Sequence, residues 1–400
     1  MLVMALAGTI ALGGVEVILR VFSDDDRYFP HHPNTVEHFY PSNEITPGVT
    51  GISRVTINSH GTRGPELAGH KTRILAVGGS TTICNIVDDR EAWPSLLMEY
   101  LNDAPENEGG VWVTNSGICG THSEHHLMHA TYLLPRLPRI DYMVVYAGIN
   151  DLGYWLHNKK FDRRYLDDSR NWSGRIGESF RQCSFTSRTD PWFKHCQLWK
   201  LGSRAKARYQ TWHATAGSLD ENGIIVQDER LLWLKQRQLK RQQRLKVKIP
   251  AAKLETLSAA LDSYASNLNA IIDCARQCGV EPILMAQAMP EHALSSDERE
   301  RLWMGSMDGG NTYVLHSERL EMLAKYNDRM RKVAEKRHVL FLDLPTHLKS
   351  VRHAYYDDCH FNELGCRETA RFVAEQLQPV LKTPRETSPQ VSVNRVHGTL

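Results

Sequence analysis

Residues 73–82 have the sequence RILAVGGSTT, in which an apolar run ends at two glycines and a serine. The run from Arg73 to Val77 has the length and composition of a buried strand. Gly78 and Gly79 let the backbone turn tightly after it and leave room for a substrate to approach. Ser80 therefore stands directly after a strand, at the edge where parallel α/β sheets bind their ligands.

Similar apolar runs recur along the chain and alternate with amphipathic segments. The further predicted strands are residues 111–113, 142–146, 282–285 and 339–342. Apolar residues repeat at intervals of three and four over residues 254–275 and 320–334, which predicts helices there. Pro94 favours the start of a helix that runs to Leu101, and Asn362 suits the cap of a last helix ending near Leu377. This alternation predicts a three-layer α/β/α fold with a parallel central sheet.

The composition is that of an ordinary globular protein. Of the 400 residues, 41% are hydrophobic and 24% are charged, and the formal net charge is only +2. A charge this small gives no broad basic field, so we expect no nucleic-acid partner.

Residues 1–22 differ in composition from the rest of the chain. No charged residue precedes Glu16, and apart from Glu16 and Arg20 the segment stays apolar to its end. At about 1.5 Å per residue, a helix of this length just reaches across a hydrocarbon core of about 30 Å. We predict a membrane anchor or signal segment, with the body on the extracytoplasmic side, in the periplasm or at the cell surface. Secretion, or a buried N-terminal helix, is the alternative.

Together with residues 1–22, three further segments make up the chain. We expect an extended lead-in at 23–70, a main domain at 71–380 with an insertion at 155–253, and a disordered tail at 381–400. The basic run from Lys235 to Lys248 indicates a solvated helix face or a patch for lipid headgroups or an acidic glycan. Tryptophans in the insertion favour core packing, or a surface for sugar rings or an acyl chain.

Cysteine and histidine patterns give no strong sign of a metal. The eight cysteines include no CxxC pair, so a structural metal is not expected. Outside the cytoplasm Cys183 could pair with Cys196 and Cys359 with Cys366, and buried free thiols are the alternative. A group of four histidines at helical spacing favours a packed or solvated helix face over metal binding. These are His122, His125, His126 and His129.

Three further segments carry residues suited to catalysis. Residues 115–120 and 148–151 each follow a predicted strand, and the side-chain amide of Asn150 could donate a hydrogen bond to an oxyanion. In residues 357–362, Asp357 precedes His360 by three positions, so its carboxylate could hold one imidazole nitrogen. The other nitrogen would then be free to take a proton from Ser80.

Together, these segments resemble four sequence blocks of the SGNH hydrolases, also called the GDSL esterase and lipase family, in the family's order. Gly79 stands where that family usually has Asp before the serine. Residues 58–64 also resemble a lead-in of membrane-tethered members, with Thr62 where an aromatic or aliphatic residue is usual. The resemblance implies an SGNH/flavodoxin-like fold and assigns roles to five residues. Ser80 is the nucleophile, His360 the general base and Asp357 its partner, and the oxyanion hole is formed by Ser80, Gly120 and Asn150.

Gly117 is an alternative to Gly120 in this alignment. The resemblance implies hydrolysis of a carboxylic ester through an acyl-enzyme, without a cofactor or metal. We expect the substrate to be a small-molecule or glycan ester, in particular a short acyl such as acetyl on a surface carbohydrate. The alternatives are an O-acyltransferase that uses the same residues, or a non-catalytic polysaccharide-binding or assembly protein.

Overall fold

The computed structural model describes residues 2–22, 28–105, 107, 109–158, 169–183, 191–203, 205–206, 228–246, 257–292, 294–307 and 312–382. Its centre is a five-stranded sheet with the order β11-β8-β6-β4-β5. The strands are β4 (Thr72–Gly78), β5 (Val111–Asn115), β6 (Tyr142–Ala147), β8 (Glu281–Ala286) and β11 (Leu340–Leu342). All four pairings between them are parallel, which confirms the predicted sheet.

The strand order places the candidate residues. Counted along the chain, the order is 2-1-3-4-5, the doubly wound arrangement in which the chain reverses direction between its first and third strands. Those strands are β4 and β6, and Ser80 and Asn150 follow them directly. Ligands bind at this switch point, beyond the carboxyl ends of the strands.

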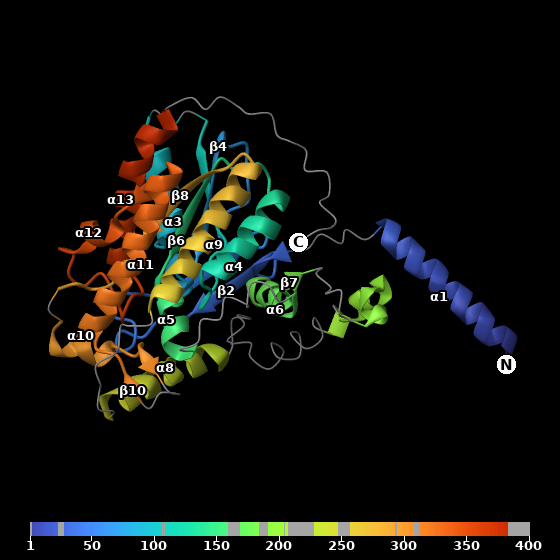
Figure 1. Cartoon of the computed structure of the whole chain (residues 1–400), viewed down its shortest axis with the longest axis horizontal. Helices are drawn as coiled ribbons and strands as arrows, with labels where there is room; N and C mark the ends of the chain where they lie inside the picture. The colour runs from blue at the N-terminus through green and yellow to red at the C-terminus, as the bar shows by residue number, and fades with distance from the viewer. Residues whose placement is uncertain are drawn as a thin grey trace.

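Side chains of β4 alternate between two apolar cores. Leu75 and Val77 pack into one core, and Ile74 and Ala76 pack into the other. The first core is covered by α4 (Ser123–Met128), α9 (Leu257–Gln277) and α11 (His316–Arg337). The second is covered by α3 (Trp93–Asn102), α12 (Leu344–Leu348) and α13 (Glu363–Lys382) (Figure 1). Because both faces are covered, the strands are buried and almost wholly apolar.

The lead-in forms structure of its own. Strand β2 (Thr35–Phe39) pairs antiparallel with β3 (Ser53–Ile57), and β1 (Tyr28–Phe29) pairs with β7 (Gln182–Cys183). Arg63 then makes an antiparallel bridge to Asn115 at the end of β5. The lead-in therefore extends the sheet at this edge.

The insertion is described in part. It contains the end of α5 (Ile149–Asn158), α6 (Ser169–Ser179), β7, a 3-10 turn at Trp192–His195 and α8 (Asp228–Lys246). Residues 159–168, 184–190, 204, 207–227 and 247–256 lie outside the described residues. Of the predicted tail, residues 381–382 complete α13 and the rest lies outside the described part. The proposed domain limits stay predictions.

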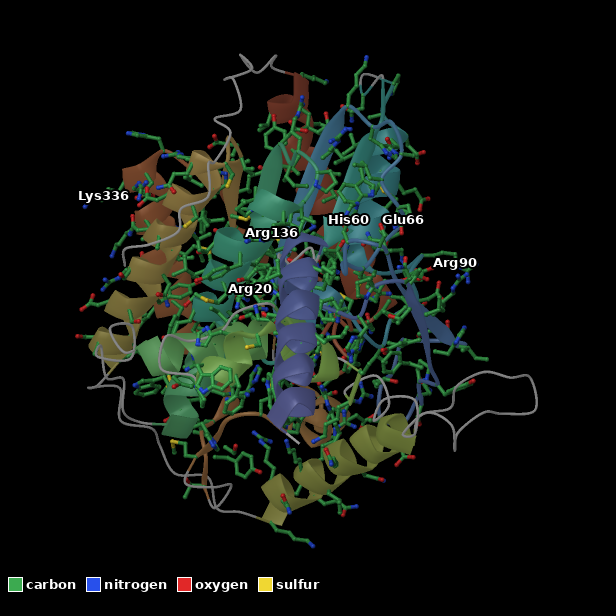
Figure 2. The ribbon with its side chains drawn as sticks, turned by 90° about the vertical axis from the view of Figure 1, so that its right-hand side faces the viewer. Arg20, His60, Glu66, Arg90, Arg136 and Lys336 are labelled. Carbon is green, nitrogen blue, oxygen red and sulfur yellow. The ribbon has the colours of Figure 1, made fainter. Side chains whose placement is uncertain are left out.

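Helix α1 (Leu2–Phe22) projects from the body of the molecule (Figure 1). No helix in the described part of the chain, α1 included, combines the length and apolar character required to cross a bilayer. The predicted membrane anchor over residues 1–22 is therefore not supported. Glu16 and Arg20 form an ion pair at 2.9 Å, and the Glu16 carboxylate accepts the backbone N–H of Gln197 at 2.9 Å. In Figure 2, Arg20 lies on α1 in front of the body.

Candidate active site

The turn from β4 to α2 (Ser80–Ile83) presents Ser80 at the start of a short helix. Both glycines before it are required by close contacts. A Cβ atom at Gly78 would lie 2.0 Å from Thr82 Oγ1, and one at Gly79 would lie 2.2 Å from Asn150 Nδ2. Any side chain at position 79 would occupy the place of the Asn150 amide.

Arg63 binds the C-terminal end of α2. Its guanidinium donates to the backbone oxygens of Ile83 at 2.5 Å, Cys84 at 2.8 Å and Val87 at 2.7 Å. It also pairs with Asp89 at 2.9 Å, and only 1% of its side chain is exposed. A cation at a helix C-terminus satisfies carbonyl groups that have no partner within the helix. From the sequence, Arg63 was noted only as part of the 58–64 lead-in, and its contact with α2 was not predicted.

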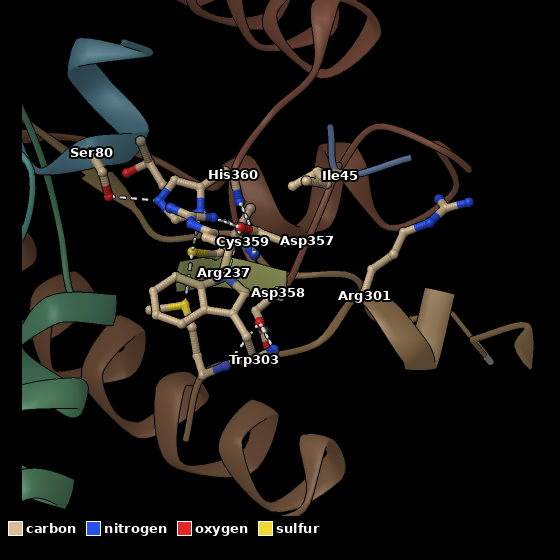
Figure 3. Close-up of polar contacts among 12 residues, drawn as sticks. Ile45, Ser80, Arg237, Arg301, Trp303, Asp357, Asp358, Cys359 and His360 are labelled. Carbon is tan, nitrogen blue, oxygen red and sulfur yellow. Dashed lines mark hydrogen bonds and ion pairs between the residues drawn. The ribbon is translucent and has the colours of Figure 1, made fainter. Parts of the chain in front are cut away.

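The loop between α12 and α13 brings His360 to Ser80. The Nε2 atom of His360 lies 2.7 Å from Ser80 Oγ, and its Nδ1 atom lies 2.8 Å from Asp357 Oδ1 (Figure 3). Asp357 Oδ1 also accepts the backbone N–H of His360 at 3.0 Å, which closes the loop on itself. Asn362 Oδ1 accepts the N–H of Gly365 at 3.1 Å and caps α13, as predicted. The three residues predicted to act together are thus within hydrogen-bonding distance.

The carboxyl of Asp357 is buried but ionised. Burial favours its neutral form, but the charges of His360 and Arg237 and hydrogen bonds from His360 and Trp303 outweigh burial and hold the pKa well below the usual range for Asp. The ring of Tyr356 stacks on His360, with ring centres 5.5 Å apart and planes inclined by 8°. The imidazole is therefore fixed by a carboxylate on one edge and an aromatic ring on one face.

Three hydrogen-bond donors are candidates for an oxyanion hole. The amide of Asn150 lies beside the turn and donates to the backbone oxygen of Thr121 at 2.7 Å. The N–H of Gly117 is already donated to Asn115 Oδ1 at 2.8 Å. Gly120 is exposed, adopts a positive φ of 79° and has no neighbour within 4 Å of where a Cβ would lie. Of the two glycines, Gly120 is the one open to a substrate, and the N–H of Ser80 is the third candidate.

Asp151, the residue after Asn150, helps to hold the Asn150 segment in place. Its carboxylate accepts the backbone N–H of Ser123 at 3.1 Å and the Ser123 hydroxyl at 2.5 Å. Burial raises the pKa of Asp151 to about 7, against the opposing effect of the Ser123 hydrogen bonds. The contact ties the start of α5, which carries Asn150, to the start of α4.

The basic run of the insertion is not a solvated helix face throughout. Three arginines of α8 are buried, and Arg237 forms an ion pair with Asp357. Both interpretations of the run assumed exposed cations, because Arg and Lys usually stay in water. The contact partners of Arg237 come from distant parts of the chain, so sequence spacing gave no sign of it. The buried arginines are Arg237, Arg241 and Arg244.

The histidine group is a packed helix face. His129 bonds to Ser116 Oγ at 3.2 Å and to the Ser179 backbone oxygen at 3.1 Å, and His125 lies 2.9 Å from Glu178. Burial, followed by the charges of neighbouring His side chains, lowers the pKa of His122 and the pKa of His126 well below the usual value, and the charge of Arg175 adds to this effect at His122.

Within the described residues, only Asp357, Cys359 and His360 place three donor atoms close enough to share an ion. There the carboxylate and imidazole already bind each other, and the Arg237 cation adjoins them. This arrangement does not favour a metal. Cys359 and Cys366, for which either a disulfide or free buried thiols was open, are both free and buried, and Cys366 Sγ lies 3.9 Å from Cys84 Sγ. Cys196 is also free, and the side chain of Cys183 lies outside the described part.

Comparisons with known proteins give distant structural matches and one family match. A putative lipolytic protein from Desulfitobacterium hafniense is 10% identical, with a TM-score of 0.36 over 76% of this chain and 99% of the other. An acetylxylan esterase from Geobacillus stearothermophilus is 13% identical, with a TM-score of 0.40 over 78% and 95% of the two chains. No protein of curated function gives a significant match. The model of the GDSL-like lipase/acylhydrolase family matches residues 76–367, so the chain belongs to that family.

Proposed function

We propose that this protein is a serine esterase that cleaves a carboxylic ester through an acyl-enzyme formed on Ser80. The observation that carries the proposal is the continuous chain of contacts from Ser80 Oγ to His360 Nε2 at 2.7 Å and from His360 Nδ1 to Asp357 Oδ1 at 2.8 Å. A serine hydroxyl is a weak nucleophile until a neighbouring base removes its proton as attack begins. Membership of an acylhydrolase family agrees with this chemistry.

The reaction follows from these contacts in two stages. His360 takes the Ser80 proton while Oγ attacks the carbonyl carbon, and the negative charge on the carbonyl oxygen is met by the N–H groups of Ser80 and Gly120 and by the Asn150 amide. The imidazolium, held by Asp357, then gives its proton to the departing alcohol. Water repeats these steps on the acyl-enzyme and releases the acid.

For the substrate we propose a short acyl ester on a carbohydrate. Ser80 is only partly buried, and Cys119 and Gly120 in the adjoining loop are exposed. A bulky alcohol portion can therefore lie outside the protein while its ester reaches the hydroxyl. The same openness favours hydrolysis over acyl transfer, because transfer requires that water be kept from the acyl-enzyme.

A fluorophosphonate probe tests the serine mechanism directly, since it reacts with an activated serine hydroxyl. We expect the wild type to be labelled and Ser80→Ala not to be labelled. Ser296→Ala, at an exposed serine of α10 (Ser296–Arg301), is the control and should be labelled like the wild type. An unlabelled wild type would support the non-catalytic binding protein instead.

A substrate panel tests the acyl and alcohol portions separately. With p-nitrophenyl esters of increasing chain length, we expect kcat/KM to be highest for acetate. An acetylated glycan should release free acetate, and added glycan acceptor should not divert the acetyl group to a new ester. Transfer to the acceptor in preference to water would establish the acyltransferase alternative.

A further inference from the structure

Helix α8 of the insertion reaches the catalytic carboxylate. Arg237 forms an ion pair with Asp357 Oδ2, and the exposed fractions of the two side chains are 9% and 0%. The guanidinium carbon also lies 4.3 Å from the ring centre of Trp303, whose Nε1 donates to the same Oδ2 atom at 2.9 Å (Figure 3). A planar guanidinium that stacks on an indole while it binds a carboxylate is held in one orientation.

The two oxygens of Asp357 have different partners. Oδ1 accepts the backbone N–H groups of Cys359 at 3.1 Å and His360 at 3.0 Å, and it lies nearest to the imidazole. Oδ2 accepts from Arg237 and Trp303, although His360 Nδ1 is also 2.9 Å away. The carboxylate is thus shared between a guanidinium and an imidazole, and the guanidinium is permanently charged.

Arg241, one turn further along α8, attaches this helix to the body of the protein through backbone oxygens only. Arg241 donates to the backbone oxygens of Arg301 at 3.0 Å and Ile45 at 2.8 Å, and it is 8% exposed. It fixes α8 to the body without touching Asp357. Arg237 instead directs its charge at the group that orients the catalytic base.

We propose that Arg237 is a positioning residue of the active site, through which the insertion fixes the Asp357 carboxylate and limits the ease with which His360 takes up a proton. The proposal rests on the proposed function of Ser80 and His360. Physically, a fixed cation beyond the carboxylate competes with the imidazolium for the same negative charge. The charge that would otherwise favour protonated His360 is partly taken by Arg237.

Other charged and titratable groups surround the pair, and Arg237 is the cation that contacts Asp357 directly. Asp358 is paired with Arg319, so its charge is largely balanced. Burial raises the pKa of Cys359 and of Tyr356 well above the usual value. The charge of Asp357 adds to this effect for Cys359, and the charge of Arg237 opposes it for Tyr356, so both groups are neutral at neutral pH. The further charged and titratable groups near the pair are Cys119, Lys240, Arg241, Glu298, Arg301 and His353.

The test is the pH dependence of fluorophosphonate labelling, which requires no knowledge of the natural substrate. Labelling needs unprotonated His360, so the rate falls at low pH. In Arg237→Gln the cation is lost, and we expect this acidic limb of the rate profile to move to higher pH. Above the limb, the labelling rate should fall between about tenfold and a hundredfold, because the carboxylate is no longer held in place.

Two variants separate charge from packing. Arg241→Gln removes a buried cation of the same helix that acts on Asp357 only from a distance, without an ion pair to it. It should lower the melting temperature, as Arg237→Gln does, but move the acidic limb less than Arg237→Gln; an equal movement in both variants would overturn the specific role of Arg237. Arg237→Lys keeps the charge and loses the fork, so we expect a slower rate with an unmoved limb. Should Arg237→Gln fail to fold, a shifted limb in Arg237→Lys would overturn the proposal.

The outcomes distinguish the two proposals. If the wild type is labelled and the limbs of the wild type and Arg237→Gln coincide, the role of Arg237 is wrong and the esterase mechanism stands. If the wild type is not labelled at any pH, the proposed function fails and the role of Arg237 fails with it.

Discussion

The side-chain amide of Asn150 is a candidate oxyanion donor and also donates a hydrogen bond to the backbone beside it. Its amide nitrogen donates to Thr121 at 2.7 Å and lies beside the Gly79 turn, so it is held in place before any substrate arrives. A donor held in this way stabilises an oxyanion without the cost of reorganisation during the reaction.

We therefore expect Asn150→Ala to lower kcat by about 10² to 10³. The loss of one half-buried hydrogen bond should cost only about 1 kcal/mol of unfolding free energy. Steady-state kinetics with p-nitrophenyl acetate, together with thermal melting, would check both. A kcat within threefold of the wild type would remove Asn150 from the oxyanion hole.

The contrast between the residues that could be predicted and those that could not has a physical basis. Ser80, Asn150 and His360 follow strands or precede a helix, so their places follow from local sequence. Arg63 and Arg237 act through contacts with segments far away in the chain, and a buried arginine is unexpected from sequence alone. Their charges are compensated only in the folded protein.

The turn between β4 and α2 leaves the space in which the Asn150 amide lies. Gly79→Ala should place a methyl group against the Asn150 amide and push it aside. We expect the labelling rate to fall about as far as in Asn150→Ala. In an Asn150→Ala background the methyl group has room, so Gly79→Ala should add little there. Two additive losses in this double-mutant cycle would contradict the predicted clash.

Arg63 gives a second prediction at this scale. Arg63→Met would leave the carbonyls of Ile83, Cys84 and Val87 and the Asp89 carboxylate without their partner. We expect a loss of about 3 to 5 kcal/mol in unfolding free energy, measured by urea denaturation. Arg90→Met is the matched control, because Arg90 is 89% exposed in its pair with Asp88 (Figure 2), and its midpoint should stay unchanged. Equal midpoints for both variants would show that Arg63 does not hold this helix.

The five central strands were predicted within two residues of their observed ends, because buried parallel strands are continuous apolar runs. The hairpin β2–β3 was not predicted and was interpreted as an extended lead-in. Its strand Thr35–Phe39 is only partly buried and has no continuous apolar run. It exists through its pairing with β3 and its place at the sheet edge, and neither is visible in the local pattern.

For the molecule as a whole, Asp151 predicts a pH dependence of stability. Burial raises the pKa of Asp151 to about 7 in the folded protein, well above the 3.8 typical of an unfolded chain. Between these values the unfolded chain releases a proton that the folded protein keeps, so stability falls as pH rises, by about 1.4 kcal/mol per unit at most. This contribution is complete below pH 4 and lost above pH 7.

Asp151→Asn removes this titration while it keeps the shape of the side chain. We expect the unfolding free energy of the variant, relative to the wild type, to rise by up to about 4 kcal/mol between pH 4 and pH 7. Urea denaturation at several pH values would measure it. Glu298, whose pKa is lowered from 4.5 to about 2 in the folded protein, changes stability only below about pH 5, and it does so equally in both proteins, so it cancels in the difference. Parallel curves for the two proteins would mean that Asp151 is ionised in the fold.

Ser80 and His360 are 280 positions apart in the chain. During synthesis on the ribosome, Ser80 and its surrounding strands emerge long before His360, so under the proposed mechanism we expect an unfinished chain to be unreactive. Reactivity appears only when the loop before α13 docks. A phosphonate added to a refolding or nascent protein would therefore report the moment at which this loop docks beside Ser80.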